Sequence, residues 1–150
     1  MKAIINLDKV KYPDVVTAKN GSDVLENGAF VALGKLVVDR LGRDCYQIGK
    51  LAEGCKLGFV ADVALMYDET KDERDFELAA GAITRVYRPK AGQGITIAKK
   101  HVNEAVVVGD KLEIKADSYQ LQKYTSGVVV AEVLEVYNFE GQDSYYIEFI

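Results

Sequence analysis

The densest run of charged side chains, positions 68–75, has the oxygen-rich composition from which calcium sites are built. An EF-hand loop beginning at its first residue would need glycine at the sixth position and glutamate at the twelfth. The chain has Glu73 and Ala79 at those positions, and Lys71 and Arg74 would repel a cation. We therefore predict a solvated surface loop here and no metal site.

Two Gly-Lys-Leu triplets, at positions 34–36 and 49–51, contain the Gly-Lys pair of phosphate-binding loops. Such a loop needs four residues between its glycines, and serine or threonine after the lysine to hold magnesium. Gly42 and Gly49 have six residues between them, and Leu51 cannot bind a metal. The Gly-Gln-Gly run at 92–94 opens no helix and is expected to form a hairpin loop. We therefore expect no nucleotide and no other cofactor.

His101 is the only histidine of the chain. A catalytic triad or a zinc centre would need partner residues at defined spacings, and none is visible. Lys99 and Lys100 precede His101 and indicate an exposed loop imidazole. We therefore expect a protein that is not an enzyme. If the chain were instead a ligand-binding or hydrolytic barrel, Arg85, His101 and Glu132 would be the first residues to inspect.

Arg85 shares one face of a predicted strand with Ile83 and Tyr87. A guanidinium group on a largely apolar face must find an acceptor, so we expect an ion pair inside the domain. The alternative is a contact with a neighbouring subunit, which makes Arg85 a candidate partner-contact residue.

Aromatic residues concentrate near the C-terminus, where Tyr137, Phe139, Tyr145 and Tyr146 fall within ten positions. Exposed aromatic side chains are enriched where proteins meet, and buried ones fill a core. Both interpretations stay open for these four residues, which are the remaining candidates for partner contact. We expect the other tyrosines to line the rims of the core: Tyr12, Tyr46, Tyr67, Tyr87, Tyr119 and Tyr124.

The net charge of −4 arises from 23 acidic and 19 basic residues that are mixed along the chain. Binding to a phosphate backbone needs clustered lysine and arginine, so we expect no nucleic-acid partner. Neither a signal peptide nor an apolar run of about 20 residues is present, and we expect no contact with a membrane. Cys45 and Cys55 are expected to be free structural thiols, although a hairpin could bring them together.

Apolar residues recur with a period of two, the pattern of strands with one buried face. The pattern covers positions 3–7, 57–67, 111–115 and 145–149. Positions 128–137 hold five valines, which disfavour a helix, so we predict a buried and bulged strand there. Closely spaced glycine turns complete the pattern of an all-β sandwich or barrel, formed by residues 1–150 as a single domain.

At most one short helix is expected. Thr70 and Glu73 resemble a capping box, and Phe76 and Ala80 follow at helical spacing before Gly81. An ordered loop over the same residues is the alternative.

Taken in chain order, the turn and strand motifs resemble those of the small head decoration (cement) proteins of tailed bacteriophages. The resemblance covers roughly residues 20 to 115. The motifs that carry it are Asn-Gly-Ala-Phe-Val at 27–31, a long strand ending in Tyr-Asp at 67–68, Phe76, Ala-Gly at 80–81, Arg-Val-Tyr-Arg at 85–88 and Val-Gly-Asp-Lys-Leu at 108–112.

This resemblance implies a structural protein on the outer capsid surface of the virion, made in the host cytoplasm. Its implied partner is the major capsid protein, whose neighbouring subunits it would bridge, with a homo-oligomer on the capsid as a further option. The family has no catalytic residues to carry over. The alternatives are a β-barrel that binds a small ligand or a peptide, and a phage tail-tube or head-completion protein.

Overall fold

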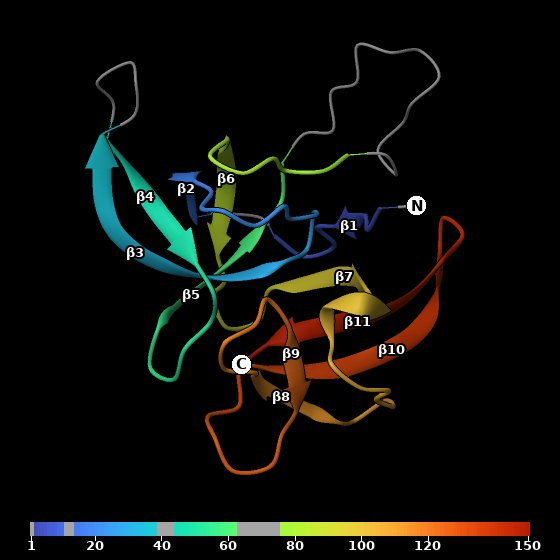
Figure 1. The fold of residues 1–150 in the computed structure, drawn as a ribbon. Coiled ribbons are helices and arrows are strands. Elements are labelled where there is room, and N and C mark those ends of the chain that lie inside the picture. Colours follow the sequence, from blue (N-terminus) through green and yellow to red (C-terminus); the bar gives the residue numbers. More distant parts are fainter. Residues whose placement is uncertain (1, 11–13, 39–43, 63–75) are drawn as a thin grey trace.

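The computed structural model describes residues 2–10, 14–38, 44–62 and 76–150, and these are built almost entirely of strands (Figure 1). Five strands close into a barrel, and a six-stranded sheet lies beside it. The only helical element in these ranges is η2, a 3-10 turn at Lys99–His101. The predicted all-β fold with barrel character is confirmed.

The barrel has the strand order β2-β4-β3-β5-β6, with β6 pairing back onto β2. Its strands are β2 (Asp14–Lys19), β3 (Phe30–Val38), β4 (Asp44–Gly49), β5 (Lys56–Val60) and β6 (Ile83–Arg88). Gly58 allows β6 to cross close to β5, because a Cβ atom there would lie 2.5 Å from a methyl group of Val86. Closure gives every strand of the barrel a hydrogen-bonded neighbour on both sides over at least part of its length.

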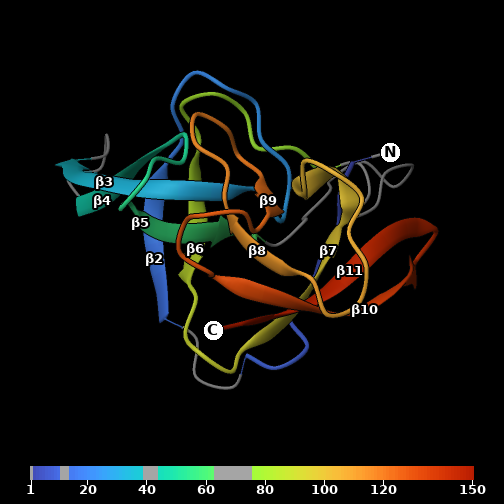
Figure 2. The same ribbon diagram turned by 90° about the horizontal axis from the view of Figure 1, so that it is seen from below.

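The sheet is antiparallel, with the order β1-β7-β11-β10-β8-β9 (Figure 2). Its strands are β1 (Ile5–Asn6), β7 (Gly94–Ala98), β8 (Lys111–Ile114), β9 (Leu121–Lys123), β10 (Ala131–Phe139) and β11 (Gln142–Phe149). A register shift between Val133 and Glu135 interrupts the pairing of β10 with β11. The bulged strand predicted at 128–137 is thus confirmed, although it begins only at Ala131. Its predicted burial is wrong beyond Val133, because β10 leaves the core there and Leu134 and Val136 are each 37% exposed.

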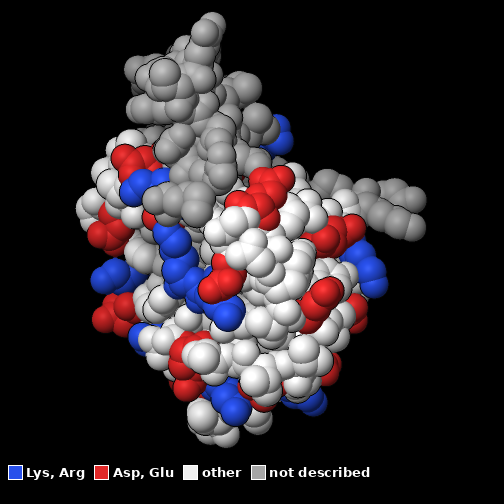
Figure 3. All heavy atoms as spheres, turned by 90° about the vertical axis from the view of Figure 1, so that its right-hand side faces the viewer, with Lys and Arg blue, Asp and Glu red and all other residues white. Residues whose placement is uncertain are grey.

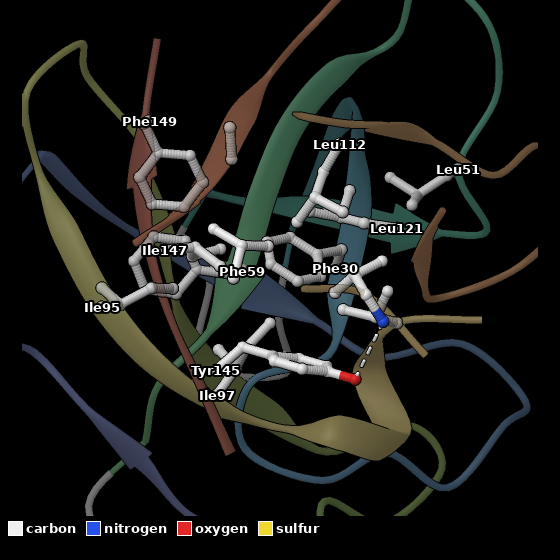
Figure 4. Packing of buried hydrophobic residues seen from close by; sticks show 14 of the residues in the cluster. Phe30, Leu51, Phe59, Ile95, Ile97, Leu112, Leu121, Tyr145, Ile147 and Phe149 are labelled. Atoms are coloured by element: carbon white, nitrogen blue, oxygen red, sulfur yellow. Dashed lines mark hydrogen bonds between the residues drawn. The ribbon is translucent and has the colours of Figure 1, made fainter. Parts of the chain in front are cut away.

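One hydrophobic core joins the barrel to the sheet (Figure 4). Phe59 of the barrel stacks on Phe149 of β11, with ring centroids 5.7 Å apart, and on Tyr87 at 5.4 Å. Phe30 meets the edge of the Phe59 ring at 6.4 Å. Side chains from both halves therefore interdigitate in this core.

Over the residues that the structure describes, two local predictions change: the ordered-loop alternative holds for residues 76–81, and one predicted strand is shorter. Residues 76–81 form no helix, because Leu78 exchanges backbone hydrogen bonds with Leu25 as a β-bridge; residues 70–75 lie outside the described ranges. The strand predicted at 57–67 ends at Val60, and positions 63–67 also lie outside these ranges. The bridge supplies long-range pairing that capping and helical spacing cannot reveal.

Candidate functional site

His101, predicted to be an exposed loop residue, is in fact buried. Its Nε2 lies 2.9 Å from the carbonyl oxygen of Asn27, which can only accept, so the neutral ring carries its proton on Nε2. Gly28, with φ +91°, leaves room for the ring, because a Cβ atom there would lie 2.9 Å from His101 Cδ2. Burial lowers the pKa of His101 to about 4. The ring is therefore neutral and has a structural role, linking η2 to the segment that contains Asn27.

The charged residues beside His101 also connect segments of the fold. Lys100 donates to Glu26 at 2.6 Å, and the backbone N–H of Ala3 donates to the same carboxylate oxygen at 2.6 Å. Lys2 lies 4.0 Å from the other Glu26 oxygen. These contacts hold the N-terminal segment against η2, and the carboxylate is saturated rather than poised for catalysis.

Glu113, predicted on the water-facing side of its strand, is only 4% exposed. Its carboxylate accepts hydrogen bonds from Gln122, from the backbone and hydroxyl of Thr125, and from the backbone of Gly127. The hydrogen bond from Thr125, followed by that from Gln122, lowers the pKa of Glu113. The residue anchors the loop between β9 and β10, which explains why a glutamate is buried there.

Arg85 was predicted on an apolar face of its strand, paired with an internal acid. It is exposed, and the buried side chains of β6 are those of its neighbours Thr84 and Val86. Within the described ranges, Arg85 makes no ion pair. Ile83, on the same face, is also exposed at 39%. The predicted internal ion pair is therefore wrong among these residues, and partner contact stays a prediction.

The remaining polar candidates form no reactive group. Among residues 2–10, 14–38, 44–62 and 76–150, no three His, Cys, Asp or Glu side chains gather as a metal site would require. Cys45 is buried, Cys55 is half-buried, and both are free thiols. Glu132 lies on β10 opposite Glu148 and beside Lys111 of β8, away from both His101 and Arg85. The three residues singled out for a ligand-binding barrel therefore do not converge.

A shallow hollow of about 180 Å³ is present beside η2. Small-molecule sites usually enclose about 300–1,000 Å³. This hollow is smaller and wide open, and its walls are Ala98, Lys99, Lys100, Gly141, Gln142 and Asp143. It does not provide the enclosed apolar chamber in which a small ligand would be held.

The C-terminal aromatic residues divide between the two faces of the sheet. Tyr145 is 1% exposed and belongs to the core, where its hydroxyl accepts a hydrogen bond from the backbone of Val106 (Figure 4). Its candidacy for partner contact is therefore wrong. Alternation places Tyr146, and its neighbours on β10, Tyr137 and Phe139, on the opposite, outer face.

We call Tyr137, Phe139 and Tyr146 the outer aromatic cluster; all three are half-buried. The rings of Tyr137 and Phe139 meet edge to face, with centroids 6.3 Å apart. Thr96 of β7 lies 2.8 Å from the Tyr137 hydroxyl and donates to Asp8 at 2.7 Å. The cluster is thus fixed in place, with part of each ring still open to a partner.

The phenol end of Tyr146 lies over Gly94 of β7. A Cβ atom at Gly94 would lie 2.5 Å from the Tyr146 hydroxyl, so only glycine allows this packing. The hydroxyl is buried and has no hydrogen-bond partner in the described part of the chain. Packing holds the Tyr146 ring in place, and the buried hydroxyl without a hydrogen-bond partner lowers the stability of the fold.

Exposed apolar side chains surround the same hairpin. Leu134 and Val136 of β10 are each 37% exposed. Val107 and Val108, in the turn before β8, are 65% and 62% exposed. This turn is attached to β10 by a hydrogen bond from the Gly109 N–H to the Val133 carbonyl. Exposed apolar groups gathered in one place mark sites of protein contact. The β10–β11 hairpin is therefore the candidate functional site, with exposed apolar and aromatic side chains of the kind found at protein interfaces.

A search of the described residues finds no helix with the length and apolar character needed to cross a membrane. Comparison of the chain with protein-family models, with curated proteins and with solved structures finds no match.

Proposed function

We propose that this chain is a head decoration protein that binds the outer surface of a phage capsid and stabilises the assembled shell. The observation that carries the proposal is the concentration of Tyr137, Phe139, Leu134 and Val136 on one projecting hairpin. Aromatic and aliphatic side chains fixed on a rigid sheet are the usual anchors of protein interfaces. The order of motifs between residues 20 and 115 is what directs the proposal to a capsid.

The physical properties of the molecule suit this role. The barrel interior is filled by side chains such as Val31, Val60 and Val86, which are fully buried, so binding is left to the surface. The shared core between barrel and sheet gives a stiff body that transmits load between two capsid subunits.

The test uses undecorated, expanded heads assembled from the major capsid protein encoded in the same genome. Purified protein is added at micromolar concentration, and the heads are sedimented and imaged. We expect saturable co-sedimentation, regular added density and a higher temperature of head disruption. Heads that stay bare would refute the proposal, and rings of the free protein would favour a tail-tube or head-completion role. A thermal shift with one specific metabolite would favour a ligand-binding barrel.

A further inference from the structure

We infer that the free edge of β10, from Glu135 to Phe139, pairs with an extended strand of a partner protein that alternates apolar and basic side chains. This inference rests on the proposed function for the identity of the partner, since it names the surface through which a head would be bound. The pairing itself follows from the backbone and charge arrangement of the hairpin.

The other edges of the sheet are occupied or short. The barrel is closed, although β3 pairs with β5 only from Phe30 to Leu33. On one side of the sheet, Leu121 of β9 bridges to Val102 and accepts a hydrogen bond from Asn103. On the other side, β1 consists of only two residues. In the described part of the chain, β10 pairs with β8 only at Ala131 and Glu132, so its edge from Glu135 to Phe139 is open.

The hairpin turn determines which backbone groups face that edge. Glu140 and Gly141 have φ values of 48° and 84°, the positive pair of a two-residue type I′ turn. Phe139 and Gln142, which flank the turn, form a hydrogen-bonded pair, and such pairs recur at every second residue. The N–H and C=O groups of Val136 and Asn138 therefore point away from β11, toward the free edge.

The geometry of the hairpin leaves room for another strand. In both ribbon views the hairpin projects beyond β7 and β8 (Figures 1 and 2). The bulge after Val133 separates the free stretch from the paired one. Gly109 and Asp110 bond to Val133, so the exposed pair Val107 and Val108 stands at the inner end of the edge. An incoming strand would bury apolar surface there.

The charge around the edge favours a basic partner. Glu135 lies on the edge itself, and Glu132, Glu140 and Asp143 lie along the same hairpin; none forms an ion pair with a described residue. Figure 3 faces the end of the molecule at which the hairpin turn lies, and shows acidic and basic side chains interspersed with uncharged surface. Lys99 and Lys100 lie beside the turn, but Lys100 is paired with Glu26 and Lys99 lies over the ring of Tyr145. A second copy of the chain would add the same acidic groups to this edge, so self-pairing is disfavoured.

The alternation of β10 specifies the alternation of its partner. Glu135 and Tyr137 point to the outer face, where lysine or arginine would meet a carboxylate and the open face of an aromatic ring. Val136 points to the core side, since its cross-strand partner is the buried Tyr145. A partner strand would therefore place basic residues outward and apolar residues inward.

Bulges and charges also protect edge strands from aggregation. That role alone accounts for Glu135 and for the register shift. It does not account for Leu134 and Val136, which stay exposed beside the same edge, where a protective design would place polar residues. Protection against unspecific pairing and selection of a basic strand are compatible, because one carboxylate serves both.

The pairing can be tested on the intact free protein with capped eight-residue peptides. One peptide alternates valine and lysine, the second alternates valine and glutamate, and the third is the lysine peptide with N-methyl groups on the edge-facing amides. Binding is followed by NMR shifts and by hydrogen exchange of the Val136 and Asn138 amides. We expect the lysine peptide to bind at least about tenfold more tightly than the glutamate peptide, and the methylated peptide to lose binding.

Variants of the protein extend the test. Asn138→Pro removes one outward N–H, and Glu135→Lys reverses the charge; both should weaken binding of the lysine peptide by about tenfold. Glu53→Lys, an equal charge change at an exposed turn of the barrel, should leave binding unchanged. If Asn138→Pro does not fold, Glu135→Lys and the methylated peptide give the same information.

Several outcomes would overturn the inference. These are equal affinity for the two charged peptides, signal changes outside β10, or a dimer of the free protein with protected β10 amides. A strand peptide that binds while heads stay bare would contradict only the proposed capsid role. Heads that bind the wild type and the Asn138→Pro and Glu135→Lys variants equally would contradict only the strand pairing.

Discussion

The buried His101 makes a distinctive prediction, because it is the only histidine in the chain. Its ordinary pKa of 6.5 applies to the unfolded chain, and burial lowers the value in the fold to about 4. Between these two values the unfolded chain binds a proton that the folded protein does not. Acidification therefore favours unfolding, and stability is lost as the pH falls from above 6.5 toward 4.

The size of the effect follows from the two pKa values. A depression from 6.5 to about 4 corresponds to about 3 kcal/mol of folding free energy once the pH lies below both. Between pH 7 and pH 5 the expected loss is about 2 kcal/mol. Three carboxyl groups with lowered pKa values contribute mainly below this window. Hydrogen bonds from Arg88 to Asp14 and from Thr125 to Glu113 lower those pKa values. Burial alone would raise the pKa of Glu26, but hydrogen bonds from Lys100 and Ala3 lower it, and all three contributions disappear below about pH 5.

The assay is urea unfolding at constant ionic strength, at pH 7, 6 and 5, with the His101 ring proton followed by NMR in parallel. The unfolding free energy should fall by about 2 kcal/mol over this range, and the ring should titrate near pH 4. His101→Gln is the control, because its amide can donate to the Asn27 carbonyl and carries no charge. A wild-type stability that does not change from pH 7 to 5, or an equal loss in His101→Gln, would refute the reasoning.

Three further predictions concern the sheet. Tyr146→Phe removes a buried hydroxyl that has no partner, and should raise the unfolding free energy by about 1 kcal/mol. Tyr137→Phe removes a hydrogen bond, and should lower the unfolding free energy by about 1 kcal/mol. Both values are measured by urea unfolding, and the opposite order of stabilities would contradict the assigned contacts. Glu140→Asn should stabilise the hairpin by roughly 0.5 kcal/mol, because asparagine tolerates the positive φ of the turn better; a lower melting temperature would count against a type I′ turn. Glu113→Gln should speed hydrogen exchange at Gly127 relative to the amides of β11, and unchanged exchange would show that the carboxylate does not hold the loop.

Alternation in the sequence was enough to predict most of the sheet. Leu112, Val133 and Ile147 all point inward as the period of two requires, and the valine-rich stretch forms a bulged strand. The helical spacing of Phe76 and Ala80 did not predict the structure of residues 76–81, because the bridge between Leu25 and Leu78 is set by residues more than fifty positions apart. Local spacing carries no information about such pairing.

The candidate site was predictable only in part. A cluster of aromatic residues near the C-terminus was visible in the sequence, and alternation already separates Tyr145 from Tyr137, Phe139 and Tyr146 once the register of the hairpin is known. Burial of His101 and Glu113 was not visible, because both depend on acceptors or donors supplied by distant loops. A histidine that follows two lysines is predicted to be exposed, and only the fold shows that the Asn27 carbonyl accepts its hydrogen bond.

The central claim is that β10 and its outer aromatic cluster form the binding surface of this protein. The most direct measurement is a cryo-electron microscopy reconstruction of heads incubated with the purified chain, at a resolution that separates strands. We expect a capsid segment that runs beside Val136 and Asn138 and continues the sheet as an added strand. Density attached through the barrel, with the β10 edge open to solvent, would contradict this claim.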